Sequence, residues 1–316
     1  MSRFNQLLAA LLTLQLVVAG GLYFYNRPQP AGAANQPLVA ATPQQIDRIT
    51  ITDEQGGELL LQRDGNAWQL PGYFQLPAQA AKVSAMLDKL TTTTPGYPVA
   101  TTAASQRRFK VADQQFGKKI VLNQGEQTLA TLYLGTSPGF RQLHLRRAGE
   151  EAVYAVKLNS FDFPTKADAW LDTSLLQPRG EIAAIQGPDY ALTNNGGQWQ
   201  LKEGEGEVDA EAVKRLTDAL ANIRVLEASE PKEGSPGQSL TLQAGGETLT
   251  YRFFKDGGHH YVSRDDRPQW FRISQTDYDR ISGEKAPQLV KRSDSTTPDV
   301  ATNPDKTEKP AADQHG

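Results

Sequence analysis

The stretch IDRITITDEQGGELLLQRDGNAWQL, residues 46–70, is the most informative part of the chain because a second stretch repeats its pattern. That second stretch reads EIAAIQGPDYALTNNGGQWQL and covers residues 181–201. Each has an alternating apolar and polar run, a turn, and a further run that ends in Trp-Gln-Leu; Trp68 and Trp199 lie 131 positions apart. Alternation with period 2 predicts half-buried strands. We therefore predict two copies of one strand-rich unit, with both tryptophans packed in a core.

A helical pattern follows each copy. Residues 78–90 read AQAAKVSAMLDKL and residues 209–223 read DAEAVKRLTDALANI. Their apolar residues recur at spacings of three and four, which places them on one face of an amphipathic helix. Asp209 is a suitable N-cap for the second helix. The apolar faces are expected to pack on the strands that come next.

Those next strands also occur twice. KKIVLNQGEQTLATLYLG, residues 118–135, corresponds to SLTLQAGGETLTYRFFKDG, residues 239–257, and further hairpin patterns follow both. Short turns containing Gly, Asn and Asp favour antiparallel hairpins. The predicted fold class is α+β, with two tandem β-rich repeats that each combine antiparallel strands with one main amphipathic helix. We place the first module at residues 44–176 and the second at residues 177–284.

The N-terminal residues, 1–25, predict a membrane anchor. The chain from Leu7 to Tyr25 carries no charge, and its length approaches the roughly 20 residues that a helix needs to cross a bilayer. Arg3 before it favours a cytoplasmic N-terminus, with the body on the other side. The alternative is a signal peptide cleaved after the small residues Ala31-Gly32-Ala33. Both interpretations place the body outside the cytoplasm.

The segments flanking the two modules have the composition of linkers. Residues 26–43 are rich in Pro, Ala, Gly and Gln, which predicts an extended tether. Residues 285–316 are dominated by polar residues and proline, and we expect a disordered tail because so little apolar area could be buried there.

Overall composition excludes several functions. The 316 residues include 33 basic and 36 acidic side chains, for a net charge of -3, and no cysteine. A nucleic-acid-binding protein would be expected to show a clustered basic face, so we expect no nucleic-acid partner. Without cysteine there is no disulfide, thiolate nucleophile or cysteine metal site.

The motif Gly135-Thr136-Ser137-Pro138-Gly139 matches the G-x-S-x-G nucleophile elbow of serine hydrolases. In that elbow the residue after serine donates its backbone N–H to the oxyanion hole, and a helix follows. Here that residue is proline, which has no N–H, and the next segment, FRQLHLRR, alternates like a strand. We predict a hairpin turn rather than a catalytic serine.

The other candidate sites have structural explanations. His259 and His260 are adjacent in a strand-like run, so they would point to opposite faces, and the acidic run at residues 203–207 has the composition of a solvated loop. We predict no catalytic, cofactor-binding or metal-ligating residue. Tyr73 and Phe74, beside a turn, are the candidate partner surface because exposed aromatic side chains often mark recognition sites.

The chain resembles the bacterial family known as domain of unknown function 4340. The resemblance lies in WQLP at residues 68–71, the helix at residues 78–90, RRFKV, KKIVL, LATLYLG, HLRRAGEEAVYAV and FPTKADAWLDTSLL at residues 163–176. Members are membrane-anchored and often encoded beside gliding-motility-type ABC transporters. The resemblance implies an accessory role near such a transporter, at the inner membrane with the body in the periplasm, and it implies no catalytic residues.

The predicted function is therefore a non-enzymatic, single-pass accessory or assembly protein that meets the lipid bilayer through Leu7 to Tyr25. Its partner would be a membrane or envelope protein, an ABC transporter among them. The alternatives are an envelope glycan-binding module and a hydrolase.

Overall fold

The computed structural model describes residues 14–15, 18, 36–203, 206–231 and 237–291. Within those ranges, no helix is both long and apolar enough to cross a bilayer. The predicted membrane anchor from Leu7 to Tyr25 lies almost wholly outside the described residues, as do residues 26–35 of the predicted tether and residues 292–316 of the predicted tail.

The described chain is mostly antiparallel sheet with a few helices, in agreement with the predicted α+β class. The first eight-stranded sheet has the order β10-β9-β8-β7-β1-β2-β3-β4. Its strands are β1 (Arg48–Asp53), β2 (Glu58–Asp64), β3 (Ala67–Leu70), β4 (Leu76–Pro77), β7 (Lys118–Gln124), β8 (Gln127–Leu134), β9 (Leu143–Arg147) and β10 (Tyr154–Val156). A separate ribbon joins β5 (Val111–Ala112) to β6 (Gln115–Phe116).

The second eight-stranded sheet has the order β13-β12-β11-β15-β16-β17-β18-β14. Its strands are β11 (Ile182–Gln186), β12 (Ala191–Asn195), β13 (Gln198–Leu201), β14 (Glu227–Ser229), β15 (Gln238–Ala244), β16 (Glu247–Asp256), β17 (His259–Arg264) and β18 (Arg267–Ile273).

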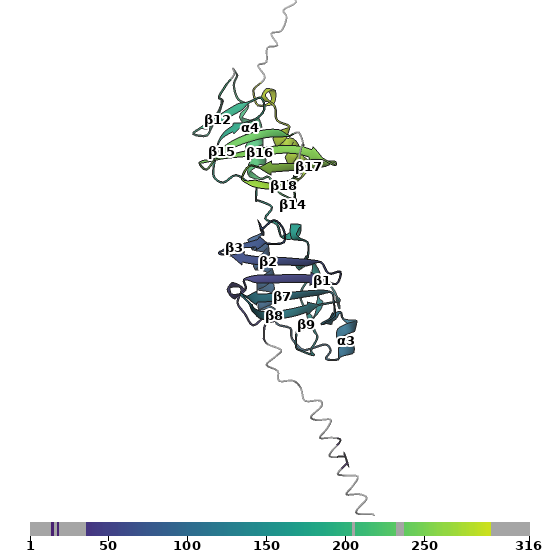
Figure 1. Ribbon diagram of the computed structural model, residues 1–316. Coiled ribbons are helices and arrows are strands. Elements are labelled where there is room, and N and C mark those ends of the chain that lie inside the picture. The colour runs from purple at the N-terminus through teal and green to yellow at the C-terminus, as the bar shows by residue number, and fades with distance from the viewer. Residues whose placement is uncertain (1–13, 16–17, 19–35, 204–205, 232–236, 292–316) are drawn as a thin grey trace, which may run out of the picture.

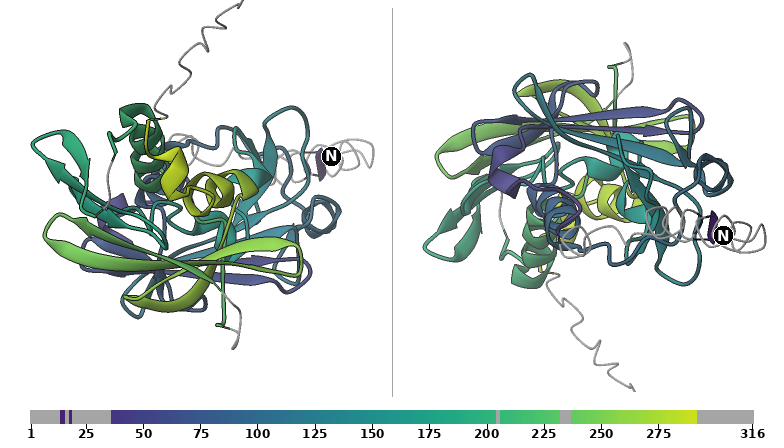
Figure 2. Two further views of the ribbon diagram at one scale, coloured as in Figure 1. Left: turned by 90° about the horizontal axis from the view of Figure 1, so that it is seen from above. Right: turned by 90° about the horizontal axis from the view of Figure 1, so that it is seen from below.

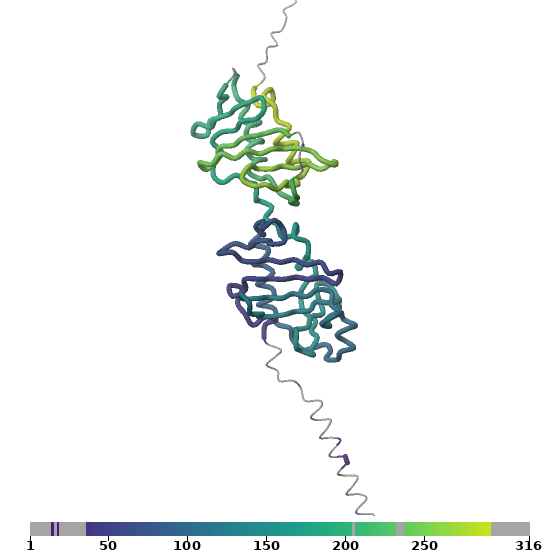
Figure 3. Tube along the Cα trace, viewed as in Figure 1, coloured from purple at the N-terminus to yellow at the C-terminus, as the bar shows by residue number. Residues whose placement is uncertain are grey.

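The two strand orders correspond when β1 is aligned with β11. The order β3-β2-β1-β7-β8-β9-β10 in the first sheet then matches β13-β12-β11-β15-β16-β17-β18 in the second. The register of the hairpin that contains each tryptophan also agrees, because Arg63 lies opposite Trp68 and Asn194 lies opposite Trp199. Only β4 and β14 have no counterpart in these orders. The β3–β4 edge of the first sheet faces the β14 edge of the second, so both extra strands lie at the junction (Figures 1 and 3).

The helices are α2 (Ala80–Thr92), α3 (Ala103–Arg108), α4 (Ala210–Ala221) and α5 (Gln275–Ser282), and short 3-10 turns occur at η1 (Pro43–Gln45), η2 (Ser160–Asp162), η3 (Ala167–Trp170) and η4 (Ala286–Gln288). Figure 2 shows α2, α4 and α5 on one side of the sheets. The predicted apolar faces are buried there, through Val83, Met86, Leu87 and Leu90 of α2 and Val213, Leu216 and Leu220 of α4. Burying a side chain of this size contributes roughly 1.5–3 kcal/mol.

A continuous apolar core includes buried residues of both sheets. Trp68 is buried in it, whereas Trp199 is only partly buried against it. On the opposite face of the first sheet, a small second core forms around Tyr133 beneath α3 and β5. Because Leu132 and Tyr133 are adjacent on β8, alternation places one in each core.

The folded body extends into both flanking segments. Leu38 and Val39, inside the predicted tether, are buried, and the Leu38 N–H donates to the Thr93 carbonyl oxygen over 2.8 Å. Leu289, inside the predicted tail, is also buried, and its carbonyl oxygen accepts a 2.9 Å hydrogen bond from the Asp209 N–H. One or two aliphatic residues are enough to make these contacts. The predictions for the two segments used their average composition, in which so few aliphatic residues are not visible.

The two sheets lie one beyond the other, edge to edge, so the described body begins at the far end of the first sheet and ends at the far end of the second (Figure 1). At the junction, the Tyr73 hydroxyl donates to the Ala228 carbonyl oxygen over 2.8 Å and accepts from the Ala228 N–H over 2.6 Å. The segment that joins the two sheets, residues 171–181 and here called the linker, adds a 2.9 Å hydrogen bond from the Val225 N–H to the Thr173 carbonyl oxygen. Tyr73 thus occupies the place that a neighbouring strand would take beside edge strand β14.

Candidate functional site

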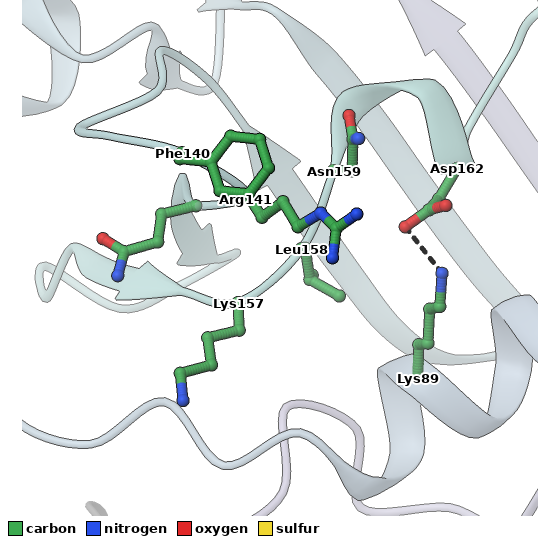
Figure 4. Close-up of a pocket in the computed structure, with 8 residues that line it drawn as sticks. Lys89, Phe140, Arg141, Lys157, Leu158, Asn159 and Asp162 are labelled. Atoms are coloured by element: carbon green, nitrogen blue, oxygen red, sulfur yellow. Dashed lines mark ion pairs between the residues drawn. The ribbon is translucent and has the colours of Figure 1, made fainter.

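A cleft of about 540 Å³ opens on the part of the body built around the first eight-stranded sheet, here called the first unit, with the second unit built around the other sheet. It lies at the end of the sheet where β8 meets β9 and β10 ends (Figure 4). It combines positive charge with apolar surface. The residues that line it are Lys89, Phe140, Arg141, Gln142, Lys157, Leu158, Asn159 and Asp162. They come from the last turn of α2, the loop between β8 and β9, and the segment after β10.

The cleft carries three cations and one carboxylate. The Lys89 ammonium pairs with the Asp162 carboxylate at 2.8 Å. Within the described part of the chain, Arg141 and Lys157 have no acidic partner within ion-pair distance. Figure 4 shows Arg141 reaching toward the side that holds Asn159, while Lys157 extends away from Asp162. Two uncompensated cations therefore remain for an anionic ligand or partner.

An exposed aromatic ring borders these charges. Phe140, which lines the cleft, is 87% exposed, and Phe161, outside the lining but adjacent in sequence to Asp162, is 86% exposed. The Arg141 guanidinium carbon lies 5.0 Å from the centre of the Phe140 ring. Arg141 has a φ of 53°, a conformation that only a few per cent of non-glycine residues adopt. The loop thus presents an apolar ring and a cation together, the combination that favours recognition surfaces.

The loop that presents Phe140 and Arg141 is the G-x-S-x-G motif and its continuation. It is anchored on one side by the Gly135 N–H, which donates to the His144 carbonyl oxygen over 2.9 Å, and on the other by the Thr136 N–H, which donates to the Phe109 carbonyl oxygen over 2.9 Å. Gly135 has no room for a side chain, because a Cβ there would lie 1.8 Å from the Phe109 carbonyl oxygen. The motif glycine is therefore explained by close packing.

The hairpin predicted for this motif is confirmed. The chain after Gly139 enters strand β9, and no helix follows the serine. The Ser137 hydroxyl donates to the Gly139 carbonyl oxygen over 2.6 Å. His144, the nearest histidine in sequence, instead contacts the Thr136 carbonyl oxygen through Nδ1 at 3.0 Å. Ser137 and His144 thus do not form a nucleophile and base pair.

His144 supports the loop from beneath. Its ring stacks on Phe109 with centroids 3.9 Å apart. Burial lowers the pKa of His144, and the nearby Arg108 lowers it further, whereas the hydrogen bond to Thr136 partly opposes the change. The ring is therefore neutral at pH 7, with Nδ1–H as the donor to the Thr136 carbonyl oxygen.

The other sequence candidates lie away from the cleft. His259 follows the Gly257-Gly258 turn opposite Asp256, while the His260 ring lies 4.9 Å from that of Tyr278. Asp209 caps α4, as predicted, by accepting from the backbone N–H groups of Glu211 and Ala212. Among the residues described, no three His, Cys, Asp or Glu side chains form a group that could hold a metal ion.

Tyr73 and Phe74, the predicted partner surface, lie at the junction between the sheets. Both are half-buried against the common core, and the Tyr73 hydroxyl is bonded to Ala228. Sequence reasoning did not single out Phe140, Arg141 or Lys157. The available signal was a phenylalanine directly after the Pro138-Gly139 turn, where no strand alternation requires an apolar side chain.

Comparison with known proteins identifies one family. The model of the family described as domain of unknown function (DUF4340) matches residues 68–245, which confirms the resemblance given by the sequence. No curated protein and no solved structure matches the chain. The match starts at Trp68 in the first sheet and ends at Gly245 in the turn between β15 and β16, so it includes the cleft.

Proposed function

Since the chain belongs to the DUF4340 family, we propose that it is a non-catalytic accessory or assembly protein of the bacterial envelope. In this proposal, residues 1–25 anchor it in the inner membrane and the two-sheet body stands in the periplasm. The body binds an acidic segment of an envelope partner, for which a component of an ABC transporter is our leading candidate. The charged cleft beside Phe140 is the observation that carries the binding role.

The cleft is suited to a protein partner for two reasons. Arg141 and Lys157 are exposed and without acidic partners among the described residues, so an acidic segment would gain attraction without first breaking an ion pair. The adjacent Phe140 ring supplies apolar area that is still in contact with water. Interfaces commonly combine an aromatic residue with arginine in this way.

The matching strand orders support a finer interpretation of the body as two copies of one unit. Their correspondence extends to the position of Trp68 and Trp199 in the register. The cleft lies in the first copy. The second copy lengthens the body on the side opposite the cleft. We propose that this extension serves assembly, because it offers a second surface at a fixed distance from the first.

The test is affinity capture of the full-length protein from solubilised membranes. A double variant, Arg141→Glu with Lys157→Glu, reverses the charge of the cleft. We expect it to recover the envelope partner roughly tenfold less well, a loss of about 1.4 kcal/mol in binding. Raising the salt concentration should weaken capture by the wild-type protein, since exposed charges are screened.

The matched control is Lys202→Glu with Arg252→Glu, which makes the same charge change at exposed positions of the second unit. This control should capture the partner as well as the wild type does. Equal loss in both double variants would attribute the effect to net charge and would refute binding at the cleft.

Binding to envelope glycan is a second candidate, favoured by the two exposed rings at Phe140 and Phe161. Sugar rings stack on aromatic faces, and cations beside them could pair with glycan carboxylates. Retention on isolated peptidoglycan that is lost in Phe140→Ala, and kept in Tyr97→Ala, would support this candidate. Tyr97 is the control because it is also 80% exposed but does not line the cleft.

A further inference from the structure

A second pocket, of about 200 Å³, lies between the linker and the second sheet. Three arginines line it: Arg179 from the linker, Arg264 at the end of β17 and Arg267 at the start of β18. The acidic residues in its wall are Asp266 and Glu247. It is separate from the cleft of the first unit and shares no residue with it.

The walls of this pocket are held by specific contacts. The Tyr251 hydroxyl donates to the Leu176 carbonyl oxygen over 2.7 Å, which ties the linker to β16. Gly245 approaches the Arg179 backbone so closely that a Cβ there would lie 2.4 Å from the Arg179 carbonyl oxygen. Gln177 donates from its side chain to the Ile223 carbonyl oxygen over 3.3 Å. The position of each wall is therefore fixed by the fold.

Arg264 and Asp266 satisfy each other. Arg264 is 7% exposed, and its Nε and Nη2 donate to the two carboxylate oxygens of Asp266 over 2.5 and 2.8 Å. A bidentate pair of this kind uses both oxygens of the carboxylate. Asp266 is thus already engaged when the other two arginines are considered.

Arg267 lacks an equivalent partner. Its Nε is buried and has no hydrogen-bond partner within the described chain, and the nearest carboxylate oxygen, on Asp266, is 3.7 Å away. Burial is the main cause that lowers the pKa of Arg267. Attraction to Asp266 opposes this most, repulsion from Arg264 and Arg179 adds to the lowering, and attraction to Asp172 also opposes it. A buried donor without an acceptor costs about 1–3 kcal/mol.

Arg179 adds a further cation to the same space. Its side chain has no acidic partner within ion-pair distance among the described residues. Two guanidinium groups, those of Arg179 and Arg267, therefore line a pocket in which Asp266 is already paired with Arg264. Glu247 forms no ion pair with either of them within the described chain. Guanidinium groups bind carboxylate and phosphate oxygens in preference to other ligands.

We propose that this arginine pocket binds a small oxyanion, such as a phosphate or carboxylate group, between the linker and the second sheet. The anion accepts hydrogen bonds from the guanidinium groups of Arg267 and Arg179, which both line the pocket. It thereby neutralises the charge that the three arginines hold in excess and fastens the linker to the sheet. The pocket volume suits a group of a few non-hydrogen atoms, and a longer ligand would extend past exposed Arg179.

The test is calorimetric titration of the full-length protein with inorganic phosphate, with acetate, and with chloride at matched ionic strength. We expect saturable binding of phosphate or acetate, and none of chloride. The ligand that binds with the higher affinity shows whether the pocket prefers a phosphate or a carboxylate group. A ligand that binds here should also raise the melting temperature, since it joins two parts of the fold.

Variants at two positions, Arg267 and Arg179, assign the binding to the pocket. Arg267→Gln should weaken it roughly tenfold, and Arg267→Lys should restore only part of it because an ammonium cannot form the two-pronged contact. Arg179→Gln should weaken it as well, and this exposed residue remains informative if Arg267→Gln does not fold. The control is Arg252→Gln, an exposed arginine on β16 outside the pocket.

The absence of saturable binding by the wild-type protein would overturn the proposal. Binding that is equally strong in Arg179→Gln and Arg267→Gln would overturn it too, because the anion would then lie elsewhere. Neither result would affect the proposal that the cleft of the first unit binds a partner, because that proposal is tested with different variants and by partner capture.

Discussion

At the scale of single residues, the G-x-S-x-G motif illustrates how packing can produce a catalytic-looking pattern. Gly135 allows two backbone segments to meet, and Ser137 closes its own turn. Neither task requires a partner histidine. The nearby His144 is occupied by its contacts with Thr136 and Phe109.

Gly135→Ala is expected to destabilise the protein by more than about 2 kcal/mol, since the added methyl group would overlap backbone atoms. Ser137→Ala should change stability by less than about 0.5 kcal/mol, because the hydroxyl is exposed. Urea denaturation of both variants measures the difference. Similar costs for the two changes would contradict this account of the motif.

A second residue-scale prediction concerns pH. Because the pKa of His144 is lowered from 6.5 in the folded protein, the unfolded chain binds its proton first as the pH falls. The stability associated with the neutral ring is therefore complete above pH 6.5 and is lost as the pH falls through the lowered pKa. Denaturation midpoints from about pH 8 to about pH 5 should fall more steeply for the wild type than for His144→Leu. Parallel profiles would exclude His144 as the cause.

At the scale of elements, strands and main helices follow from local patterns, whereas several connections do not. The alternating runs around Trp68 and Trp199 and the apolar spacing of α2 and α4 predict their elements directly. The α3, β5 and β6 insertion and the short β14 have no such pattern. They are held by contacts with distant residues, such as Phe109 with Thr136, that local sequence does not specify.

The same division applies to the candidate site. Sequence reasoning explained the motif turn and the Asp209 cap, because each depends on residues within a few positions. The cleft depends on the meeting of α2, the β8–β9 loop and the segment after β10, which are far apart in sequence. Tyr73 was selected as an exposed aromatic, yet its hydroxyl is bonded to Ala228, 155 residues away.

Asp209→Ala tests the start of α4. The Asp209 Oδ1 atom accepts 3.0 Å hydrogen bonds from the N–H groups of Glu211 and Ala212. Their loss should cost about 1 kcal/mol. Asp209→Asn keeps the acceptor, so it should cost only a few tenths of a kcal/mol through the helix dipole. Equal costs in chemical denaturation would show that charge, and not the cap, stabilises this end.

At the scale of the whole molecule, the junction determines whether the two sheets unfold together. Their apolar cores are continuous, and Tyr73 supplies hydrogen bonds to the edge strand of the second sheet. The linker adds contacts from Thr173 and Leu176. This arrangement favours a single cooperative unit rather than two independent ones.

Tyr73→Phe removes the hydroxyl and leaves both Ala228 backbone groups without that partner. We expect a loss of about 1–3 kcal/mol and a broadened or split calorimetric transition, because the two sheets become less strongly coupled. Tyr97→Phe is the control at an exposed tyrosine. A single, unshifted transition in Tyr73→Phe would show that the apolar core alone couples the sheets.

The edge-to-edge arrangement of the two sheets also has a mechanical consequence. Since the described body starts at one extremity and finishes at the other, with strands running across the line between them (Figure 1), tension between the two ends would pass through both sheets in series. Such a pull would peel strands apart one after another instead of shearing them all at once. The molecule would therefore lengthen in steps under modest force, and the pair of neighbouring strands with the weakest contacts would separate first.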